Sequence, residues 1–271
     1  SVGTLSVANP ELTSITWTAA AGSKLTHDNV TATQATAVTV QLDTGTQATS
    51  VFGNFSLTGA AVTVKGTIGD QATTDAVTIT GKSIASSNFT VGAGTGTSGG
   101  IMELPTLDGA VTSGTIGTVT IDAGIASYVK QSVGTGSAVK SIGGIVAKGM
   151  GNIEVTLGAV TAATATGSYY GSVDASGMTS SLGSFTLKAV LANDELTVTG
   201  GAGNDTITGG TGNDLITGGK GKDTIDLGNA GSSATGGKDI VVIGSGDSPT
   251  SAAGDVIKNF TVGGPAQTDG D

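Results

Sequence analysis

The sequence predicts an all-β protein, built as a parallel β-solenoid whose C-terminal third is a β-roll. Three observations lead to this prediction: short runs rich in Val, Ile and Thr recur along the chain, turn-forming residues separate them, and a nine-residue repeat occupies residues 200–226. Aromatic residues make up only 3% of the 271 residues, so the expected core consists of small branched side chains. Such side chains suit the narrow interior of a solenoid.

The apolar runs before residue 190 have irregular spacing. Examples are residues 37–40, 61–68, 76–80, 117–122, 152–157 and 184–190. They fit the rungs of a solenoid with loops of variable length, while the first ~90 residues also fit a separate sandwich-like unit. Helical periodicity is weak, and residues 123–131 are the best candidate for a short helix.

Two regions differ in composition. Residues 1–190 are rich in Thr, Ala and Gly and are expected to form one β domain, with a potential subdivision near 92–100. Residues 191–271, which contain the nine-residue repeat, are expected to form a second domain. More than half of the 21 acidic residues lie in this second region, in turns, which indicates a cationic ligand there.

The repeat consists of the consecutive units GGAGNDTIT, GGTGNDLIT and GGKGKDTID. Glycines at positions one, two and four permit a tight turn, and the isoleucine at position eight is expected to face the core. Two units complete one coil, so the first and third units should stack. Asp205 and Asp223 should then lie one above the other, about one strand spacing of 4.7–4.9 Å apart, with Asp214 on the opposite side.

Stacked carboxylates repel each other unless a cation lies between them. The ligands available in these turns are oxygen atoms of carboxylates and backbone carbonyls, which suit a hard ion. Calcium, which accepts many oxygen ligands in a flexible cage, fits better than the strictly octahedral magnesium.

Residues 200–226 resemble the calcium-binding β-roll of RTX (repeats-in-toxin) proteins. The resemblance implies that the carboxylates of Asp205, Asp214 and Asp223 are calcium ligands. It also implies carbonyl ligands from the turns, which are Gly200, Ala202, Gly209, Thr211, Gly218 and Lys220. Imperfect units on either side add Asp194 and Asp239 as weaker ligands, and we expect two to five Ca²⁺ ions in total.

Two flanking segments carry further resemblances. Residues 173–210 are similar to the lead-in of RTX-type surface-layer (S-layer) proteins of bacteria, and residues 245–264 resemble the strand that follows the repeats in RTX proteins and caps the roll. Family members continue to a C-terminal signal for type I secretion. Because the sequence starts without Met and stops before such a signal, we expect it to be a piece of a longer secreted protein.

Composition argues against several classes of function. A formal net charge of −10 with no arginine excludes nucleic acid as a partner, and no run of about 18 apolar residues predicts insertion into a membrane. The only histidine, His27, lies outside any HExxH pattern, so we expect no enzyme. The absence of cysteine is compatible with an exported protein stabilised by something other than disulfides.

The leading hypothesis is a secreted, extracellular structural protein of the bacterial cell surface, a subunit of a surface layer or filament whose folding and assembly depend on calcium. Expected partners are other copies of the chain, through calcium-dependent contacts, with a cell-surface polysaccharide as a further candidate. The alternatives are an adhesin or host-binding module of an RTX protein, and the C-terminal secretion or stability module of an RTX exoenzyme.

Overall fold

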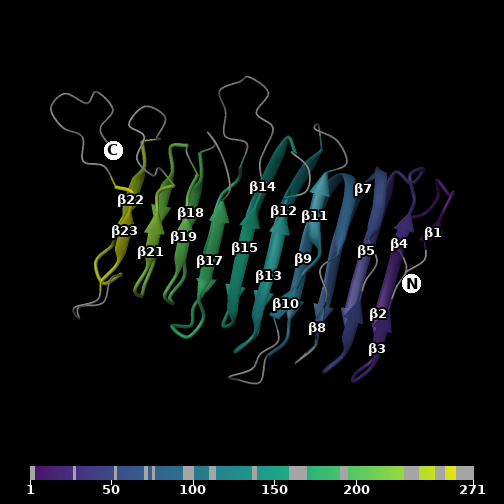
Figure 1. Ribbon diagram of the computed structural model, residues 1–271, viewed down its shortest axis with the longest axis horizontal. Coiled ribbons are helices and arrows are strands. Elements are labelled where there is room, and N and C mark those ends of the chain that lie inside the picture. Colours follow the sequence, from purple (N-terminus) through teal and green to yellow (C-terminus); the bar gives the residue numbers. More distant parts are fainter. Residues whose placement is uncertain are drawn as a thin grey trace.

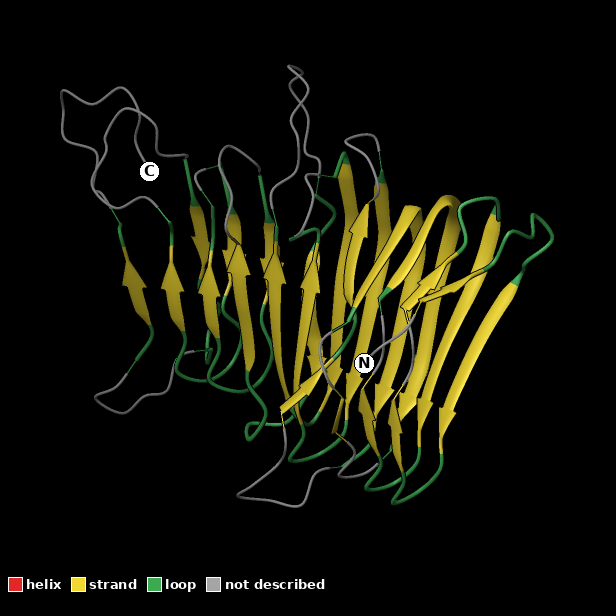
Figure 2. Cartoon of the chain, turned by 45° about the vertical axis from the view of Figure 1, so that its right-hand side comes forward, coloured by secondary structure: helices red, strands yellow, loops and turns green. Residues whose placement is uncertain are grey.

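The computed structural model describes residues 4–26, 29–51, 54–69, 73–74, 77–93, 101–109, 114–135, 139–158, 170–189, 195–210, 212–228, 238–247 and 254–260. Every regular element in these ranges is a β-strand, and the strands stack as parallel coils along one axis (Figure 1; Figure 2). The predicted parallel β-solenoid is confirmed. It includes the described part of the first 90 residues, so the alternative of a separate sandwich there is wrong.

Most strands form two rows, one on each side of the solenoid. The first row runs through β1 (Thr4–Ser6), β4 (Asn29–Thr31), β7 (Phe55–Ile68), β9 (Thr78–Val91), β11 (Thr106–Gly109), β13 (Tyr128–Val133), β15 (Asn152–Leu157), β17 (Phe185–Ala189), β19 (Thr206–Thr208), β21 (Thr224–Asp226) and β23 (Val256–Lys258). The second row begins with β2 (Ser14–Ala19) and β5 (Ala37–Thr44), shares β7 and β9, and continues through β12 (Thr115–Ala123), β14 (Ser141–Gly149), β16 (Val173–Met178), β18 (Thr197–Thr199), β20 (Leu215–Thr217) and β22 (Ile240–Val242).

The solenoid changes from three sides to two along its length. A third row holds β3 (Lys24–Thr26), β6 (Thr49–Val51) and β8 (Thr73–Thr74), and β8 contacts β10 (Ile101–Glu103). Both β10 and β11 then pair with the single strand β13, so the third side merges into the first row. The later coils have two sides only, which is the geometry of a flat roll.

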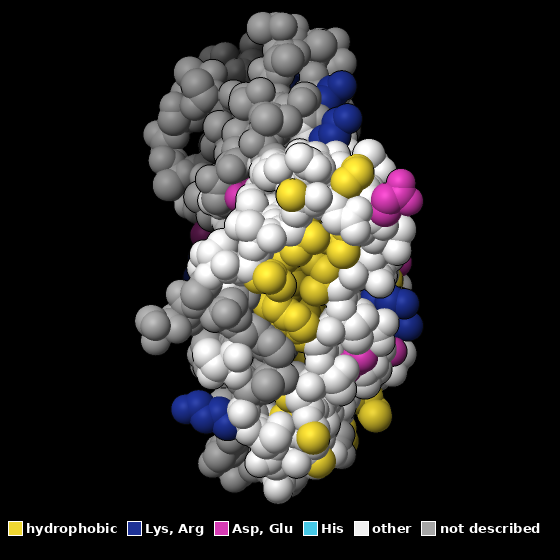
Figure 3. Space-filling model, turned by 90° about the vertical axis from the view of Figure 1, so that its right-hand side faces the viewer, with side chains coloured by type: hydrophobic (Ala, Val, Ile, Leu, Met, Phe, Trp, Pro, Cys, Tyr) yellow, Lys and Arg dark blue, Asp and Glu magenta, His cyan; other side chains and the backbone are white. Residues whose placement is uncertain are grey.

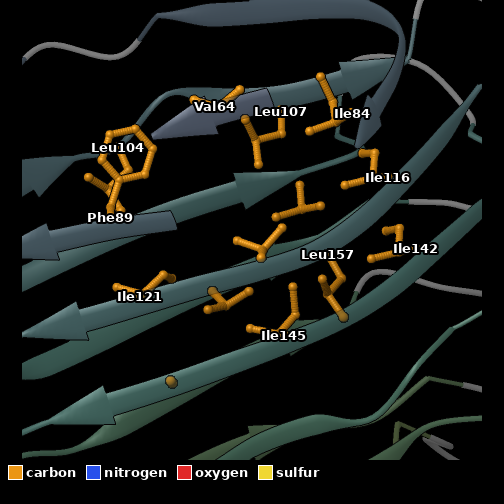
Figure 4. Packing of buried hydrophobic residues seen from close by; sticks show 14 of the residues in the cluster. Val64, Ile84, Phe89, Leu104, Leu107, Ile116, Ile121, Ile142, Ile145 and Leu157 are labelled. Carbon is orange, nitrogen blue, oxygen red and sulfur yellow. The ribbon is translucent and has the colours of Figure 1, made fainter. Parts of the chain in front are cut away.

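The interior is a continuous stack of branched aliphatic side chains. In β5, Val38, Val40 and Leu42 are buried while the residues between them face outward, as expected for a strand with one buried side. Figure 4 shows Ile116 and Ile142, partners in the adjacent strands β12 and β14, side by side among buried side chains of successive coils. Each coil therefore covers the apolar face of the next.

All six predicted apolar runs coincide with or overlap a strand. The short helix expected at 123–131 is wrong, because this segment is a tight turn followed by β13. Ala126 has a positive φ of 58°, and the Ser127 hydroxyl and backbone N–H both donate to the Gly124 carbonyl. The strand alternation of burial after Tyr128 outweighs the weak helical spacing of the apolar residues.

Figure 3 looks onto the end of the solenoid where β1 and β2 lie and shows hydrophobic side chains gathered near the centre of that end. Leu12, Ile15 and Trp17 are partly buried there against the core, and the ring of Trp17 lies 4.7 Å from that of Phe55 in a following coil. The described residues contain no helix long and apolar enough to cross a membrane.

Candidate metal centre

The repeats place their aspartates on two opposite edges of the roll. Each aspartate directly precedes a short strand, and strands of the first row alternate along the chain with strands of the second. The strand β19 pairs with β21 so that Ile207 lies beside Ile225, one coil later. Asp205 and Asp223 therefore stack on one edge while Asp214, before β20, lies on the other, as predicted.

The strands that carry these turns are held by one buried side chain each. Ile207, Ile216 and Ile225 are buried, whereas the residues on either side of each isoleucine within its strand are at least partly exposed. The strands are so short that this isoleucine and the parallel pairing with adjacent coils fix their position. The turns consequently keep one orientation from coil to coil.

The aspartates are buried as well. Relative exposure is 2% for Asp205, 2% for Asp214 and 0% for Asp223. An ionised carboxylate at such positions costs free energy unless hydrogen bonds or a cation compensate for the lost water.

One carboxylate oxygen of each aspartate bonds to the coil before it. Asp205 Oδ1 accepts the backbone N–H of Phe185 at 2.8 Å, and Asp223 Oδ1 accepts that of Asp205 at 2.9 Å. On the opposite edge, Asp214 Oδ1 accepts the N–H of Leu196, and Asp239 Oδ1 accepts that of Asp214, both at 2.9 Å. These bonds form what we call the aspartate ladder, which links successive coils through their turns.

The second carboxylate oxygen differs between the repeats. Asp205 Oδ2 accepts the N–H of Gly201 at 2.6 Å, and Asp214 Oδ2 accepts that of Gly210 at 3.0 Å. Asp223 Oδ2 is buried and has no hydrogen-bond donor among the described residues. The third repeat thus presents a carboxylate oxygen that receives no hydrogen bond from the described residues.

Burial and neighbouring carboxylates weaken the acidity of all three groups. Desolvation and, to a smaller extent, the charge of Asp223 raise the pKa of Asp205 to about 7, against hydrogen bonds from Phe185 and Gly201 that lower it. Desolvation likewise raises the pKa of Asp214 and of Asp223 to about 6. A bound cation would remove this penalty, because its charge favours the ionised form.

The glycines of the repeats have two structural roles. Gly219 and Gly221 have positive φ angles of 97° and 117°, which confirms the expected turn conformation in the third unit. Gly200 and Gly203 are required because adjacent coils approach each other closely at these positions. A Cβ atom there would collide with the carbonyl oxygens of Gly218 and Gly183, respectively. A side chain at these positions would therefore separate coils that must stack.

The donor set fits calcium. Among the described residues, no group of three or more acidic or histidine side chains is placed so that these side chains could hold a metal ion, so backbone carbonyls and water would have to supply most of the ligands. Calcium takes six to eight oxygen ligands, and backbone carbonyls and water contribute many of them in proteins. Buried carboxylates in turns without cysteine or histidine match that preference better than the preference of transition metals.

The turns contain most of the residues expected as ligands. Gly200, Ala202 and the turn ending at Asp205 lie beside Gly218, Lys220 and the turn ending at Asp223. Gly209 lies in the Asp214 turn on the opposite edge, where Asp239 stacks on Asp214 through the ladder. Thr211, Asp194 and also His27 lie outside the described residues.

The structure adds acidic residues that the repeat pattern did not identify. Asp255 continues the ladder beyond Asp223, and the charges of Asp255 and Asp247 both raise the pKa of Asp223. Glu195 acts in the same way on Asp214. A signal for Asp255 exists in the sequence, since Asp255 stands two residues before Ile257 as Asp205 stands before Ile207.

A comparison with protein families finds the RTX calcium-binding nonapeptide repeat (4 copies) at residues 198–230. This match covers the three predicted units and with them the strands β19, β20 and β21. Comparisons with curated proteins and with solved structures gave no match.

Proposed function

Since residues 198–230 of this chain form an RTX calcium-binding β-roll, we propose that the protein is a secreted bacterial structural protein whose folding and assembly at the cell surface require calcium. RTX repeat proteins are typically exported by type I secretion, which supports an extracellular location. The proposed role is structural, as a surface-layer or filament subunit, and not enzymatic.

The observation that carries the proposal is the buried, stacked carboxylates of the roll. Asp205, Asp214 and Asp223 have raised pKa values because of burial, and no lysine forms an ion pair with them among the described residues. When bound, calcium supplies the positive charge that these carboxylates lack. The folded roll then gains stability from binding, because the unfolded chain holds no such site.

The roll is joined directly to the longer solenoid. The strand β17 pairs with β15 on one side and with β19 on the other, and Asp205 accepts the backbone N–H of Phe185 at the start of β17. Ordering of the roll therefore supplies a template edge on which the preceding coils stack. This continuity favours a structural element of the surface over a detachable export tag.

The calcium concentration that such sites require supports folding outside the cell. Calcium sites of extracellular modules bind at about 10⁻⁴–10⁻³ M, far above the level in a bacterial cytosol. The chain would remain unfolded in the roll region during export and would fold on release. We expect between two and five ions, on both edges of the roll.

Circular dichroism and electron microscopy test the proposal together. The variant Asp205→Asn/Asp223→Asn keeps the carbonyl acceptors but loses two charges, and Asp122→Asn/Asp174→Asn is a control with the same charge change on the outer faces of β12 and β16. At millimolar calcium the wild type and the control should gain strand content and form regular lattices or filaments, and the first variant should do neither. Strand content that does not change on chelation would refute the calcium requirement.

An adhesin is the second candidate function, and a pocket on the solenoid supports it. The pocket lies beside the segment that links β10 to β11, next to β13 and β15, and polar side chains line it, among them Glu103, Lys130, Glu154 and Thr156. A protein that stays monomeric at millimolar calcium would favour this candidate over a lattice subunit.

A further inference from the structure

Three exposed apolar side chains lie in a line along one edge of the solenoid. Ile125, Met150 and Leu182 occupy the turns that lead from a second-row strand to a first-row strand in three successive coils, before β13, β15 and β17. Their relative exposures are 46%, 47% and 80%. We call these three side chains the apolar stripe.

The three turns stack directly on one another. The backbone N–H of Met150 donates to the Ala123 carbonyl at 2.8 Å, which holds the second turn against the first. A Cβ atom added to Gly183 would lie 2.9 Å and 2.6 Å from the carbonyl oxygens of Met150 and Gly151, so the third turn lies against the second. Because adjacent strands are about 4.7–4.9 Å apart, the stripe presents one apolar side chain per coil at that spacing.

The surface around the stripe is small and uncharged. The other residues of segments 124–127, 149–151 and 179–183 are Gly, Ala, Ser and Thr, so the three apolar side chains project beyond their neighbours. Asp122 and Lys148, which precede two of these turns, form an ion pair with 3.4 Å between Oδ2 and Nζ. The chain has a formal net charge of −10, so two copies meet less repulsion at this edge than at the acidic turns of the roll.

From this surface we infer that the apolar stripe is a contact between two copies of the chain, in which the stripe of one copy packs against that of the other. The inference rests on the proposed assembly of the protein and names a surface that carries it. Exposed apolar patches on soluble proteins mark such contacts. A line of three side chains can pack against its own copy across a two-fold axis, and Met150 in the middle would then face its counterpart.

The first calcium turn supports the coil that carries Leu182. Asp205 Oδ1 accepts the backbone N–H of Phe185, three residues after Leu182. A Cβ atom at Gly203 would collide with the carbonyl oxygen of Gly183, so the two turns are in contact. The folded roll therefore positions the last member of the stripe. Calcium would control the contact by ordering this turn, without bridging the two copies.

Cross-linking through one introduced cysteine tests the inference, because the chain has no cysteine of its own. Met150→Cys places a thiol in the middle of the stripe, and the control Leu5→Cys places one at an apolar side chain of β1 that is 56% exposed. Under mild oxidation at millimolar calcium, Met150→Cys should form a disulfide-linked dimer and Leu5→Cys should stay monomeric. Adding Leu182→Ser to Met150→Cys should lower the yield of dimer about tenfold, because an apolar anchor of the contact is lost.

Circular dichroism and calcium titration of the same variants separate this inference from the proposed function. Wild-type strand content and calcium binding without a Met150→Cys dimer, or equal dimer formation by Leu5→Cys, overturn the stripe contact and leave the calcium-dependent fold in place. A wild type that gains no strand content with calcium and does not assemble overturns both.

Sedimentation velocity provides a second measurement that needs no cysteine. At millimolar calcium, Leu182→Ser should associate about tenfold more weakly than the wild type and than the control Leu5→Ser. This measurement decides if Met150→Cys lacks the circular dichroism of the wild type. Unchanged association of a folded Leu182→Ser variant would overturn the stripe contact.

Discussion

At the scale of the residue, the roll depends on carboxylates that have two different environments. One oxygen of Asp205, Asp214 and Asp223 always receives a backbone N–H from the coil before. The other oxygen receives a glycine N–H in the first two repeats and none among the described residues at Asp223. The first bond positions the coil, and the negative charge of the group is available to a cation.

Replacing Asp214 by Asn separates these two roles. The amide oxygen can still accept the N–H of Leu196, so the ladder bond remains while the charge is lost. Since loss of even a supporting group costs metal sites about 10- to 100-fold in affinity, we expect calcium binding on this edge to weaken at least about tenfold. Isothermal titration calorimetry against Asp174→Asn as control measures this, and an unaltered titration would contradict the assignment of Asp214 as a ligand.

The raised pKa values predict a dependence of stability on pH that calcium removes. Without calcium, the folded forms of Asp205, Asp214 and Asp223 have pKa values of about 7, 6 and 6, above the usual 3.8, so the folded state binds the extra protons. Stability of the calcium-free roll should therefore be greatest below the usual value and decrease as pH rises through about 6 to 7. With saturating calcium this decrease should disappear, because the ion keeps the carboxylates ionised in the folded state, as they already are in the unfolded chain at this pH.

Urea unfolding followed by circular dichroism, in buffer freed of calcium and in buffer with millimolar calcium, measures both trends. A calcium-free protein that becomes more stable as pH rises through this range would contradict the buried position of these carboxylates.

At the scale of the element, each strand of the roll is held by one isoleucine and by its parallel neighbours. Ile207 is buried between Ile225 and Leu187, its partners in β21 and β17. The strand β19 contains no other buried side chain. Ile207 is therefore the side chain through which β19 contacts the core of the preceding solenoid. The turn before β19 is positioned only while this isoleucine is buried.

Ile207→Ala should destabilise the calcium-loaded protein by about 2–5 kcal/mol, the usual cost of removing a large aliphatic side chain from a packed core. Thr206→Ala, at the exposed position beside it, should change the free energy of unfolding by less than about 0.5 kcal/mol. Denaturant unfolding at millimolar calcium compares the two. Equal effects of the two variants would show that the strand is not held by its buried side chain.

At the scale of the whole molecule, a three-sided solenoid continues into a two-sided roll without a break in the hydrogen-bonded rows. In the early coils, Asn54 accepts the N–H of Thr78 in the next coil across a sequence separation of 24. In the repeats, Asp223 accepts the N–H of Asp205 across a separation of only 18. The shorter coils follow the point where the third side ends at β13, and the same apolar interior runs through both parts.

The structure of the repeat could be predicted from the sequence because its glycines and aspartates recur with one period. From the sequence alone, that period placed Asp205 above Asp223 and put Asp214 on the opposite edge. The earlier coils lack such a signature, since outward Thr and inward Val alternate in any half-buried strand. The number of sides of each of these coils depends on where its turns lie in three dimensions. The spacing of apolar runs along the chain does not reveal this.

The last coil shows a further limit of the sequence pattern. Asp255 makes the same ladder bond as Asp223, but the residues between β21 and β23 lengthen this coil to 32 residues, and the bond to a glycine N–H in the turn is made by Asp247 instead. A search for one period therefore ends at the last perfect unit. The three-dimensional register, not the spacing, identifies Asp255 as a member of the ladder.

Hydrogen exchange of the full chain, followed by mass spectrometry with calcium and after chelation, tests the central claim most directly. Because the buried carboxylates of the roll need a cation, the amides of β19, β20 and β21 should be protected with calcium and should exchange rapidly after chelation. The control variant Asp122→Asn/Asp174→Asn should behave as the wild type does. Equal protection of these three strands with and without calcium would contradict the claim that calcium holds the roll in its fold.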